Sequence, residues 1–174
     1  MSKYRWQDSI RTIPDFPEPG ILFRDITTLL KSGEDFSAMI DELSEVVRAL
    51  KPDVIIGPES RGFIIGAAVA YRLRCGFIPV RKPNKLPAEV LRHEYQLEYG
   101  TDVLEIHRDA IQKGQRVVLV DDLLATGGTA GAAVKMIEEL GGTISGLVFL
   151  IELNYLNGRE KLKNYSVQTL LQYD

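Results

Sequence analysis

Several residue types are scarce in this chain, and each scarcity excludes a class of protein. The 174 residues contain one cysteine and two histidines. A single cysteine, Cys75, excludes an internal disulfide and fits a reducing compartment, so we expect a cytoplasmic protein. Neither histidine is near Cys75 in the sequence, which favours a small buried side chain over a nucleophile. His93 and His107 lack metal-like spacing, and we expect them on the surface or in a hairpin.

Long apolar runs and an excess of basic charge are also missing. No run approaches the roughly 20 apolar residues of a membrane span, and no signal peptide opens the chain, so we expect no membrane partner. The formal net charge of -3 argues against a nucleic-acid partner, because nucleic-acid-binding domains are usually strongly basic. A hydrophobic content of 45% instead indicates an ordinary globular protein, and the length suits a single domain spanning 1–174.

Two common nucleotide-binding motifs are absent, and a different loop is present. The chain has neither a Walker loop, which needs Gly-Lys-Ser/Thr, nor a Gly-x-Gly-x-x-Gly fingerprint. It does have an apolar run, Val117–Val120, in which three of four residues are β-branched, as in strands buried inside a parallel sheet. A polar and glycine-rich segment follows, and then Ala130–Leu140 shows the apolar stripe of a helix.

The residue types in this strand-to-helix loop favour an anion. Small residues let backbone N–H groups converge on a guest, and the helix N-terminus adds partial positive charge. Asp121 and Asp122 would repel a phosphate, so we expect them to face the hydroxyls of an attached sugar or the hydration shell of a metal ion. An ordinary turn with an aspartate pair capping the helix is the alternative, and the length of the motif argues against it. The loop therefore predicts a ribose 5-phosphate site, with the phosphate held by Ala125, Thr126, Gly127, Gly128 and Thr129.

A second loop of the same kind follows the apolar run Val54–Gly57. Here Pro58–Gly62 precedes a predicted helix, Phe63–Leu73, so its polar residues again lie at a helix N-terminus. Arg61 at such a turn can hold a diphosphate through bidentate hydrogen bonds, although a lone arginine more often makes a surface salt bridge.

A third basic stretch occurs in this acidic chain. Arg81, Lys82 and Lys85 lie within five residues. A solvated turn would have the same composition, but the two anion loops favour side chains that neutralise a departing pyrophosphate.

The remaining pattern predicts an α/β fold with a central, mostly parallel sheet flanked by helices. Residues 1–12 suggest a short amphipathic helix, and the proline-rich stretch 13–26 an extended, stiff loop. Polar and apolar residues alternate on both sides of Gly100–Asp102, which indicates a hairpin that could act as a mobile lid. A further helix is expected at Phe36–Leu50, with Asp35 as its N-cap. Further strands are expected at Phe77–Val80, Ile144–Leu153 and Val167–Tyr173.

These motifs together carry a resemblance to a known family. The run Val-Val-Leu-Val-Asp-Asp-Leu-Leu-Ala-Thr-Gly-Gly-Thr resembles the phosphoribosyl-pyrophosphate signature of type I phosphoribosyltransferases, and its second part is similar to that of adenine phosphoribosyltransferases. Phe-Pro-Glu-Pro-Gly-Ile-Leu-Phe-Arg-Asp-Ile resembles their base-binding hood, Ser-Arg-Gly-Phe their pyrophosphate loop and Leu-Glu-Tyr-Gly their lid. Pro58-Glu59 and Pro83-Asn84 fit the pattern loosely. The resemblance covers essentially the whole chain.

The resemblance implies a fold and a set of roles. The fold would be that of type I phosphoribosyltransferases, with a hood at about 1–30 and a flexible lid at about 81–107. Phe23 would stack on adenine, with the backbone of Leu22 and Arg24 reading its edge. Leu153 would cover the other face, although ordinary core packing competes with that role. Glu98 would act as general acid or base. A cis peptide bond is implied at Glu59-Ser60 or Ser60-Arg61, and the family suggests a homodimer.

The reaction implied is purine salvage: adenine and phosphoribosyl pyrophosphate give AMP and pyrophosphate, with Mg²⁺ carried by the substrate and no direct protein ligand. Asp121 and Asp122 would bind the ribose hydroxyls. Arg61 would act in catalysis by stabilising the leaving pyrophosphate, together with Ser60, Arg81, Lys82 and Lys85. A regulatory protein that senses the same ligand while gripping nucleic acid is one rival. A transferase for a 6-oxopurine or orotate is the other, but no lysine lies beside Phe23 or Leu153 to read a 6-oxo group.

Overall fold

The structure is a computed structural model that describes residues 4–96 and 101–174. The chain forms two compact units, Met1–Glu42 and Leu43–Asp174. Its helical segments are η1 (Arg5–Ser9), α1 (Thr27–Leu30), α2 (Gly33–Ala49), α3 (Arg61–Leu73), α4 (Gly128–Glu139), η2 (Asn154–Leu156) and η3 (Gly158–Leu162). Its strands are β1 (Arg11–Pro14), β2 (Leu22–Asp25), β3 (Val54–Pro58), β4 (Gly76–Val80), β5 (Val90–Gln96), β6 (Thr101–His107), β7 (Arg116–Leu124), β8 (Thr143–Leu153) and β9 (Val167–Tyr173).

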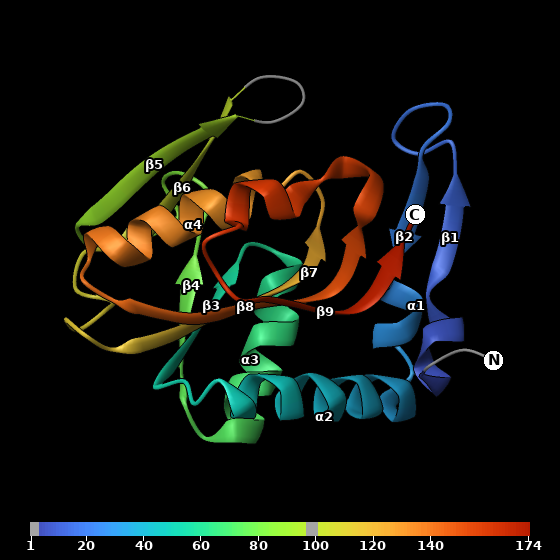
Figure 1. Ribbon diagram of the computed structural model, residues 1–174, viewed down its shortest axis with the longest axis horizontal. Coiled ribbons are helices and arrows are strands. Elements are labelled where there is room, and N and C mark those ends of the chain that lie inside the picture. Colours follow the sequence, from blue (N-terminus) through green and yellow to red (C-terminus); the bar gives the residue numbers. More distant parts are fainter. Residues whose placement is uncertain (1–3, 97–100) are drawn as a thin grey trace. The chain divides into compact units, whose positions relative to one another are not determined.

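The second unit is built on a five-stranded sheet with the order β4-β3-β7-β8-β9. Every neighbouring pair is parallel, so the predicted α/β architecture is confirmed. The chain moves outward from β3 to β4 in one direction and from β7 to β8 in the other. Because both crossovers are expected to be right-handed, their helices α3 and α4 fall on opposite faces of the sheet, as Figure 1 shows. The strand order therefore reverses between β3 and β7, which is where open α/β sheets bind ligands.

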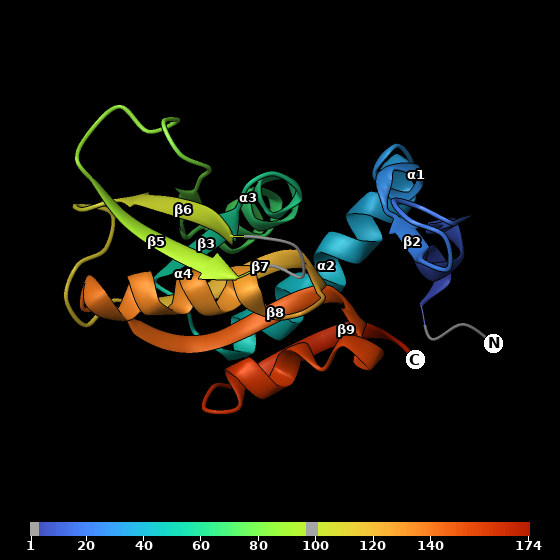
Figure 2. The same ribbon diagram turned by 90° about the horizontal axis from the view of Figure 1, so that it is seen from above.

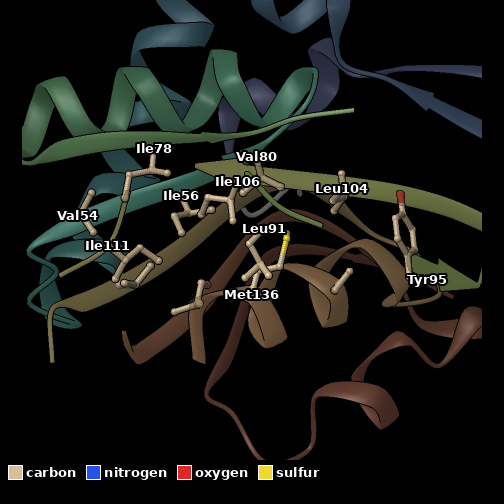
Figure 3. Packing of buried hydrophobic residues seen from close by; sticks show 13 residues of the cluster. Val54, Ile56, Ile78, Val80, Leu91, Tyr95, Leu104, Ile106, Ile111 and Met136 are labelled. Carbon is tan, nitrogen blue, oxygen red and sulfur yellow. The ribbon is translucent and has the colours of Figure 1, made fainter. Parts of the chain in front are cut away.

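The hairpin β5-β6 lies alongside α4 (Figure 2) and contributes to the core. Leu91, Leu104 and Ile106 of the hairpin are buried in one apolar cluster with strand residues and Met136 of α4 (Figure 3). The segment 81–107, which the sequence analysis assigns to a lid, thus includes a part that packs as core. His107 lies in this hairpin, where its ring nitrogen Nε2 is 3.4 Å from the backbone nitrogen of Ala88.

The first unit contains the antiparallel pair β1-β2. Its connection carries a cis Phe16-Pro17 bond and Gly20 at a φ of 88°. Trp6 is 2% exposed, so its ring packs in the interior. The predicted helix over 1–12 is wrong: among the described residues, the chain forms the short 3-10 helix η1 and then enters β1, because Arg11–Pro14 pair with Leu22–Asp25.

Other boundaries also differ from the predictions. Ser32, not Asp35, caps α2: the Ser32 hydroxyl accepts the backbone N–H of Asp35 at 3.3 Å. Strand β7 continues through Asp121 and Asp122 to Leu124, because β8 is long enough to pair with it there. Within the described parts of the chain, no helix is long and apolar enough to cross a membrane.

Candidate functional site

A cavity of about 390 Å³ lies at the carboxyl ends of β3 and β7. Its walls come from the last four residues of β7, from the segments that follow β3 and β7, and from Phe149, which pairs with Asp121 across β7 and β8. The two loops that the sequence analysis singled out as anion sites therefore meet in one place. The lining residues are Glu59, Ser60, Arg61, Asp121, Asp122, Leu123, Leu124, Ala125, Thr126, Gly127, Gly128, Thr129, Ala130 and Phe149.

The loop before α4 is shaped by close backbone packing. Gly127 is the N-cap of α4 and has a φ of 75°, a conformation that residues with a Cβ rarely adopt. A Cβ at Gly127 would also lie 2.5 Å from the carbonyl oxygen of Gly158. The loop thus leaves backbone N–H groups at a helix N-terminus, where an anion is stabilised.

The two aspartates of β7 have different surroundings. Asp121 accepts the backbone N–H of Asp122 at 2.9 Å, and its side chain lies against Gly62, where a Cβ would be 2.8 Å from Oδ1. Burial raises the pKa of Asp121 well above its usual range, and repulsion from the Asp122 carboxylate adds to this. Asp122 instead forms an ion pair with Arg61, with 2.5 Å between Oδ2 and Nε. One member of the pair is thus biased toward its neutral form, while the other is held by a guanidinium.

The loop after β3 joins the site to the basic stretch. Its cis bond is Glu59-Ser60, which decides between the two alternatives that the resemblance left open. Glu59 accepts the backbone N–H of Lys82 at 3.0 Å and forms an ion pair with Arg81 at 3.2 Å. The Lys82 hydrogen bond and, more weakly, the Arg81 side chain lower the pKa of Glu59 against the opposing effect of burial.

The three basic residues of the stretch 81–85 do not share one environment. Arg81 faces Glu59 and also donates to the backbone oxygen of Lys85 at 3.3 Å. Lys82 forms an ion pair with Asp102 on β6. The structure thus places an acid beside Arg81 and another beside Lys82. Neither of these two basic residues lines the cavity.

The residues expected to meet a base lie in both units. Leu22, Phe23 and Arg24 are on β2 of the first unit, where Phe16 packs edge-on against Phe23 with 5.1 Å between ring centroids. Leu153 ends β8 in the second unit and is 9% exposed, so it remains compatible with core packing. Glu98, the predicted general acid or base, lies outside the described residues.

Sequence reasoning missed two supports of the site. Gly158 lies behind the loop before α4, where a Cβ would come within 2.2 Å of the carbonyl oxygen of Ala125. Glu152, beside Leu153, is buried and accepts two hydrogen bonds from Arg159, at 2.6 and 2.8 Å. No local signal marks Gly158, since its contact lies more than 30 positions back along the chain. A buried glutamate at a strand end could have prompted a search for a basic partner nearby.

Comparison with known proteins gives the family. The model of the phosphoribosyl transferase domain matches residues 26–172. The chain belongs to the phosphoribosyl transferase family. It is 60% identical over 164 residues to a protein of Alkaliphilus metalliredigens named adenine phosphoribosyltransferase, covering 94% of this chain and 96% of that one. A relative of the same name from Koribacter versatilis is 59% identical over 165 residues, which is 95% of this chain and 91% of the relative.

Solved structures give the same result. The adenine phosphoribosyltransferase of Thermoanaerobacter pseudethanolicus superposes with a TM-score of 0.93 at 54% identity, covering 96% of this chain and 97% of the other. The Saccharomyces cerevisiae enzyme, solved with a bisphosphate imino sugar and adenine, has a TM-score of 0.87 at 41% identity and covers 93% and 94% of the two chains. The predicted type I phosphoribosyltransferase fold is therefore confirmed.

Proposed function

We propose that this protein transfers the 5-phosphoribosyl group from phosphoribosyl pyrophosphate to adenine, giving AMP and pyrophosphate. The observation that carries the proposal is the cavity between the ends of β3 and β7, where a phosphate-type loop, two aspartates and Arg61 meet. Relatives of up to 60% identity with the name adenine phosphoribosyltransferase support the same activity. A volume of about 390 Å³ lies in the range of small-molecule sites.

The cavity suggests how phosphoribosyl pyrophosphate would bind. The 5-phosphate would accept hydrogen bonds from the loop Ala125–Thr129, because this loop leads directly into the N-terminus of α4. The ribose hydroxyls would then face Asp121 and Asp122. Burial favours the protonated form of Asp121, which can donate a hydrogen bond as well as accept one, whereas Asp122 accepts a hydrogen bond from Arg61. The two carboxyls would therefore hold a diol in one defined orientation.

The pyrophosphate end would extend toward the Ser60–Arg61 turn. There Arg61 would exchange its bond with Asp122 for a charge-assisted bond to pyrophosphate, helped by Lys82, Arg81 and Lys85. The bond between the anomeric carbon and pyrophosphate breaks, and a ring nitrogen of adenine forms the new bond. Since the base is a fair nucleophile, positioning and charge stabilisation would supply most of the acceleration.

The carboxyls of the cavity suit Mg²⁺ that arrives with the substrate. Mg²⁺ prefers oxygen ligands and is often held by one or two carboxylates plus phosphates. In the described ranges, 4–96 and 101–174, no group of three or more His, Cys, Asp or Glu side chains is placed to hold a metal ion. Phosphate and ribose oxygens of the substrate would therefore hold it without a direct protein ligand, with Asp121 and Asp122 facing its hydration shell, and its charge would offset that of the leaving group.

The base would be read from two sides, by Phe23 and by Leu153. Adenine presents an amino donor beside a ring-nitrogen acceptor, which the backbone groups of Leu22 and Arg24 can match. Hypoxanthine reverses this pattern and would leave buried donors and acceptors unpaired. Each unpaired group would weaken binding by roughly 1–3 kcal/mol. A direct test is to incubate the protein with phosphoribosyl pyrophosphate, Mg²⁺ and each base in turn. Adenine should be consumed, while turnover of only hypoxanthine, guanine or orotate would contradict the proposal.

Glu98 is the proposed general acid or base, and it would manage a proton on the purine. We expect Glu98→Ala to lower kcat more than it changes the KM for either substrate, because the proton moves only during the reaction. Steady-state kinetics can check this. An unchanged kcat would remove Glu98 from the role.

We further propose that the protein is a cytoplasmic homodimer. Helix α3 exposes Ile64 (45%), Ala67 and Tyr71 (87%) at helical spacing, so that one face is apolar. Such a face suits a second copy, and it lies on the helix that begins with Arg61. Light scattering after gel filtration should give twice the mass of one chain.

A further inference from the structure

Tyr95, near the end of β5, has a ring that packs in the core and a hydroxyl that forms three hydrogen bonds. The residue is 9% exposed, and its ring lies at one end of the apolar cluster in Figure 3, which also contains Leu104. The hydroxyl donates to Asp102 at 3.2 Å and accepts from Lys82 at 3.5 Å and from Thr129 at 3.4 Å. A phenol has one proton and two lone pairs, so these three bonds occupy it completely.

The hairpin fixes the geometry of this network. Tyr95 and Asp102 are directly opposite in the β5-β6 register, so their side chains lie on the same face of the hairpin. Asp102 also forms an ion pair with Lys82, and one carboxylate thereby holds both a phenol and an ammonium. Burial lowers the pKa of Lys82, but the hydrogen bond from Lys82 to Asp102 and nearby charges outweigh this effect, so that the pKa is raised. Lys82 is therefore a full cation in the absence of substrate.

The two donors that meet at Tyr95 come from opposite ends of the proposed substrate site. Thr129 is in the first turn of α4, beside the loop for the 5-phosphate. Lys82 is in the basic stretch proposed for pyrophosphate. Thr129 has a single hydroxyl proton, which it donates to Tyr95, so the hydroxyl can donate to a phosphate only by giving up its bond to Tyr95. In the same way, pyrophosphate must compete with the Asp102 carboxylate for Lys82.

We infer that Tyr95 and Asp102 are positioning residues that hold Thr129 and Lys82 for the two anionic ends of phosphoribosyl pyrophosphate. Asp102 sets how readily Lys82 is released to pyrophosphate, and Tyr95 sets how readily Thr129 is released to the 5-phosphate. This inference rests on the proposed function, because it assigns the two donors to that substrate. It predicts that removing either holder strengthens binding at one end alone.

Binding of two separate probes tests the inference. In titration calorimetry, Asp102→Asn should bind magnesium pyrophosphate about tenfold more tightly than wild type, the scale of one charge-assisted hydrogen bond, with ribose 5-phosphate affinity unchanged. Tyr95→Phe keeps the ring and should bind ribose 5-phosphate about threefold more tightly, the scale of one neutral hydrogen bond. Pyrophosphate affinity should stay nearly unchanged, because the Asp102 ion pair still holds Lys82 after its 3.5 Å contact with the hydroxyl is lost. A general loss of structure cannot raise the affinity for one probe and leave the affinity for the other unchanged.

Three controls make each outcome decisive. Glu94→Gln removes a negative charge from an exposed side chain of the same strand and should leave both affinities unchanged, which separates the Asp102 contact from net charge. Asp102→Ser serves if the asparagine variant does not fold. In a Lys82→Met background, Asp102→Asn should no longer tighten pyrophosphate binding, since the held group is gone.

The failure of this inference can be told apart from the failure of the proposed function. If wild type binds both probes but Asp102→Asn binds pyrophosphate equally or more weakly, the role of Asp102 is refuted while the function stands. If Tyr95→Phe does not change ribose 5-phosphate affinity, the role of Tyr95 is refuted in the same way. If wild type binds neither probe, the proposed function is refuted and the inference with it.

Discussion

The contact between Gly158 and the phosphate-type loop gives a sharp test of how the site is supported. A Cβ at Gly158 would lie 2.2 Å from the carbonyl oxygen of Ala125, 3.1 Å from the backbone nitrogen of Gly127 and 3.0 Å from a methyl group of Leu124. Two of these three atoms belong to the backbone, so a rotamer change cannot relieve the clash. Gly158→Ala must therefore move η3 or the loop by about 1 Å, since ordinary van der Waals contacts begin near 3.5 Å.

The size of the effect follows from this displacement. Overpacking a buried site costs about 1–3 kcal/mol in the free energy of unfolding. A shift of about 1 Å in groups that position a substrate can cost on the order of a hundredfold in rate. We therefore expect Gly158→Ala to lower the melting temperature and to raise the KM for phosphoribosyl pyrophosphate much more than the KM for adenine. Thermal unfolding and steady-state kinetics with each substrate varied in turn measure both quantities.

Gly131 provides a matched control in α4, the helix that this loop enters. A Cβ at Gly131 would meet no atom within 4 Å. Because alanine is favoured over glycine inside a helix by about 0.8–1 kcal/mol, Gly131→Ala should raise the melting temperature by roughly 2–4 °C and leave the KM values unchanged. If Gly158→Ala matched Gly131→Ala in both melting temperature and KM, the argument that Gly158 supports the loop would be refuted.

Two further predictions concern buried charges. Glu152→Gln should lower the free energy of unfolding by about 1–2 kcal/mol in urea titrations, because a neutral amide weakens the charge-assisted hydrogen bonds that the buried carboxylate accepts from the half-exposed Arg159; an unchanged midpoint would contradict this. The backbone N–H of Thr27, followed by Arg11, lowers the pKa of Asp25 from 3.8 to about 2, so this carboxylate stabilises the fold above pH 4 and loses that effect as the pH falls toward 2. Asp25→Asn should therefore cost about 1–2 kcal/mol at pH 7 and much less near pH 2, where the carboxylate is about half protonated, and equal costs at both pH values would show that the charge is not the cause.

Local patterns were sufficient for the parts of the fold that depend on neighbouring residues. The β-branched run Val117–Val120 identifies a buried strand, and glycines before an apolar stripe identify the turn into α4. The same reasoning placed Asp121 and Asp122 at the carboxyl end of the strand, and the cavity lies there. It ended the strand too early, because the length of β7 is set by its partner β8, which pairs with it as far as Leu124.

Contacts between distant segments could not be predicted in this way. Residues 1–12 have the i, i+4 apolar spacing of a helix, but pairing of Arg11–Pro14 with β2 outweighs that local preference. The partner of Lys82 depends on the register of the hairpin, which sets Asp102 opposite Tyr95. Likewise, nothing near Gly158 in the sequence shows that it packs against Ala125. Each of these features follows from tertiary packing, which a single sequence does not reveal.

The acid partners of the basic residues explain how an acidic protein can select a polyanion. Arg61 is paired with Asp122, Arg81 with Glu59 and Lys82 with Asp102, so three of the four basic residues proposed for pyrophosphate already have acid partners. An unrelated polyanion therefore meets little free positive charge, and each bond it gains must replace an existing ion pair. Phosphoribosyl pyrophosphate differs because its ribose hydroxyls can occupy Asp122, the carboxylate that its pyrophosphate displaces from Arg61. This exchange of partners at the Arg61–Asp122 pair thus gives discrimination by shape and hydrogen bonding, where attraction by net charge would give none.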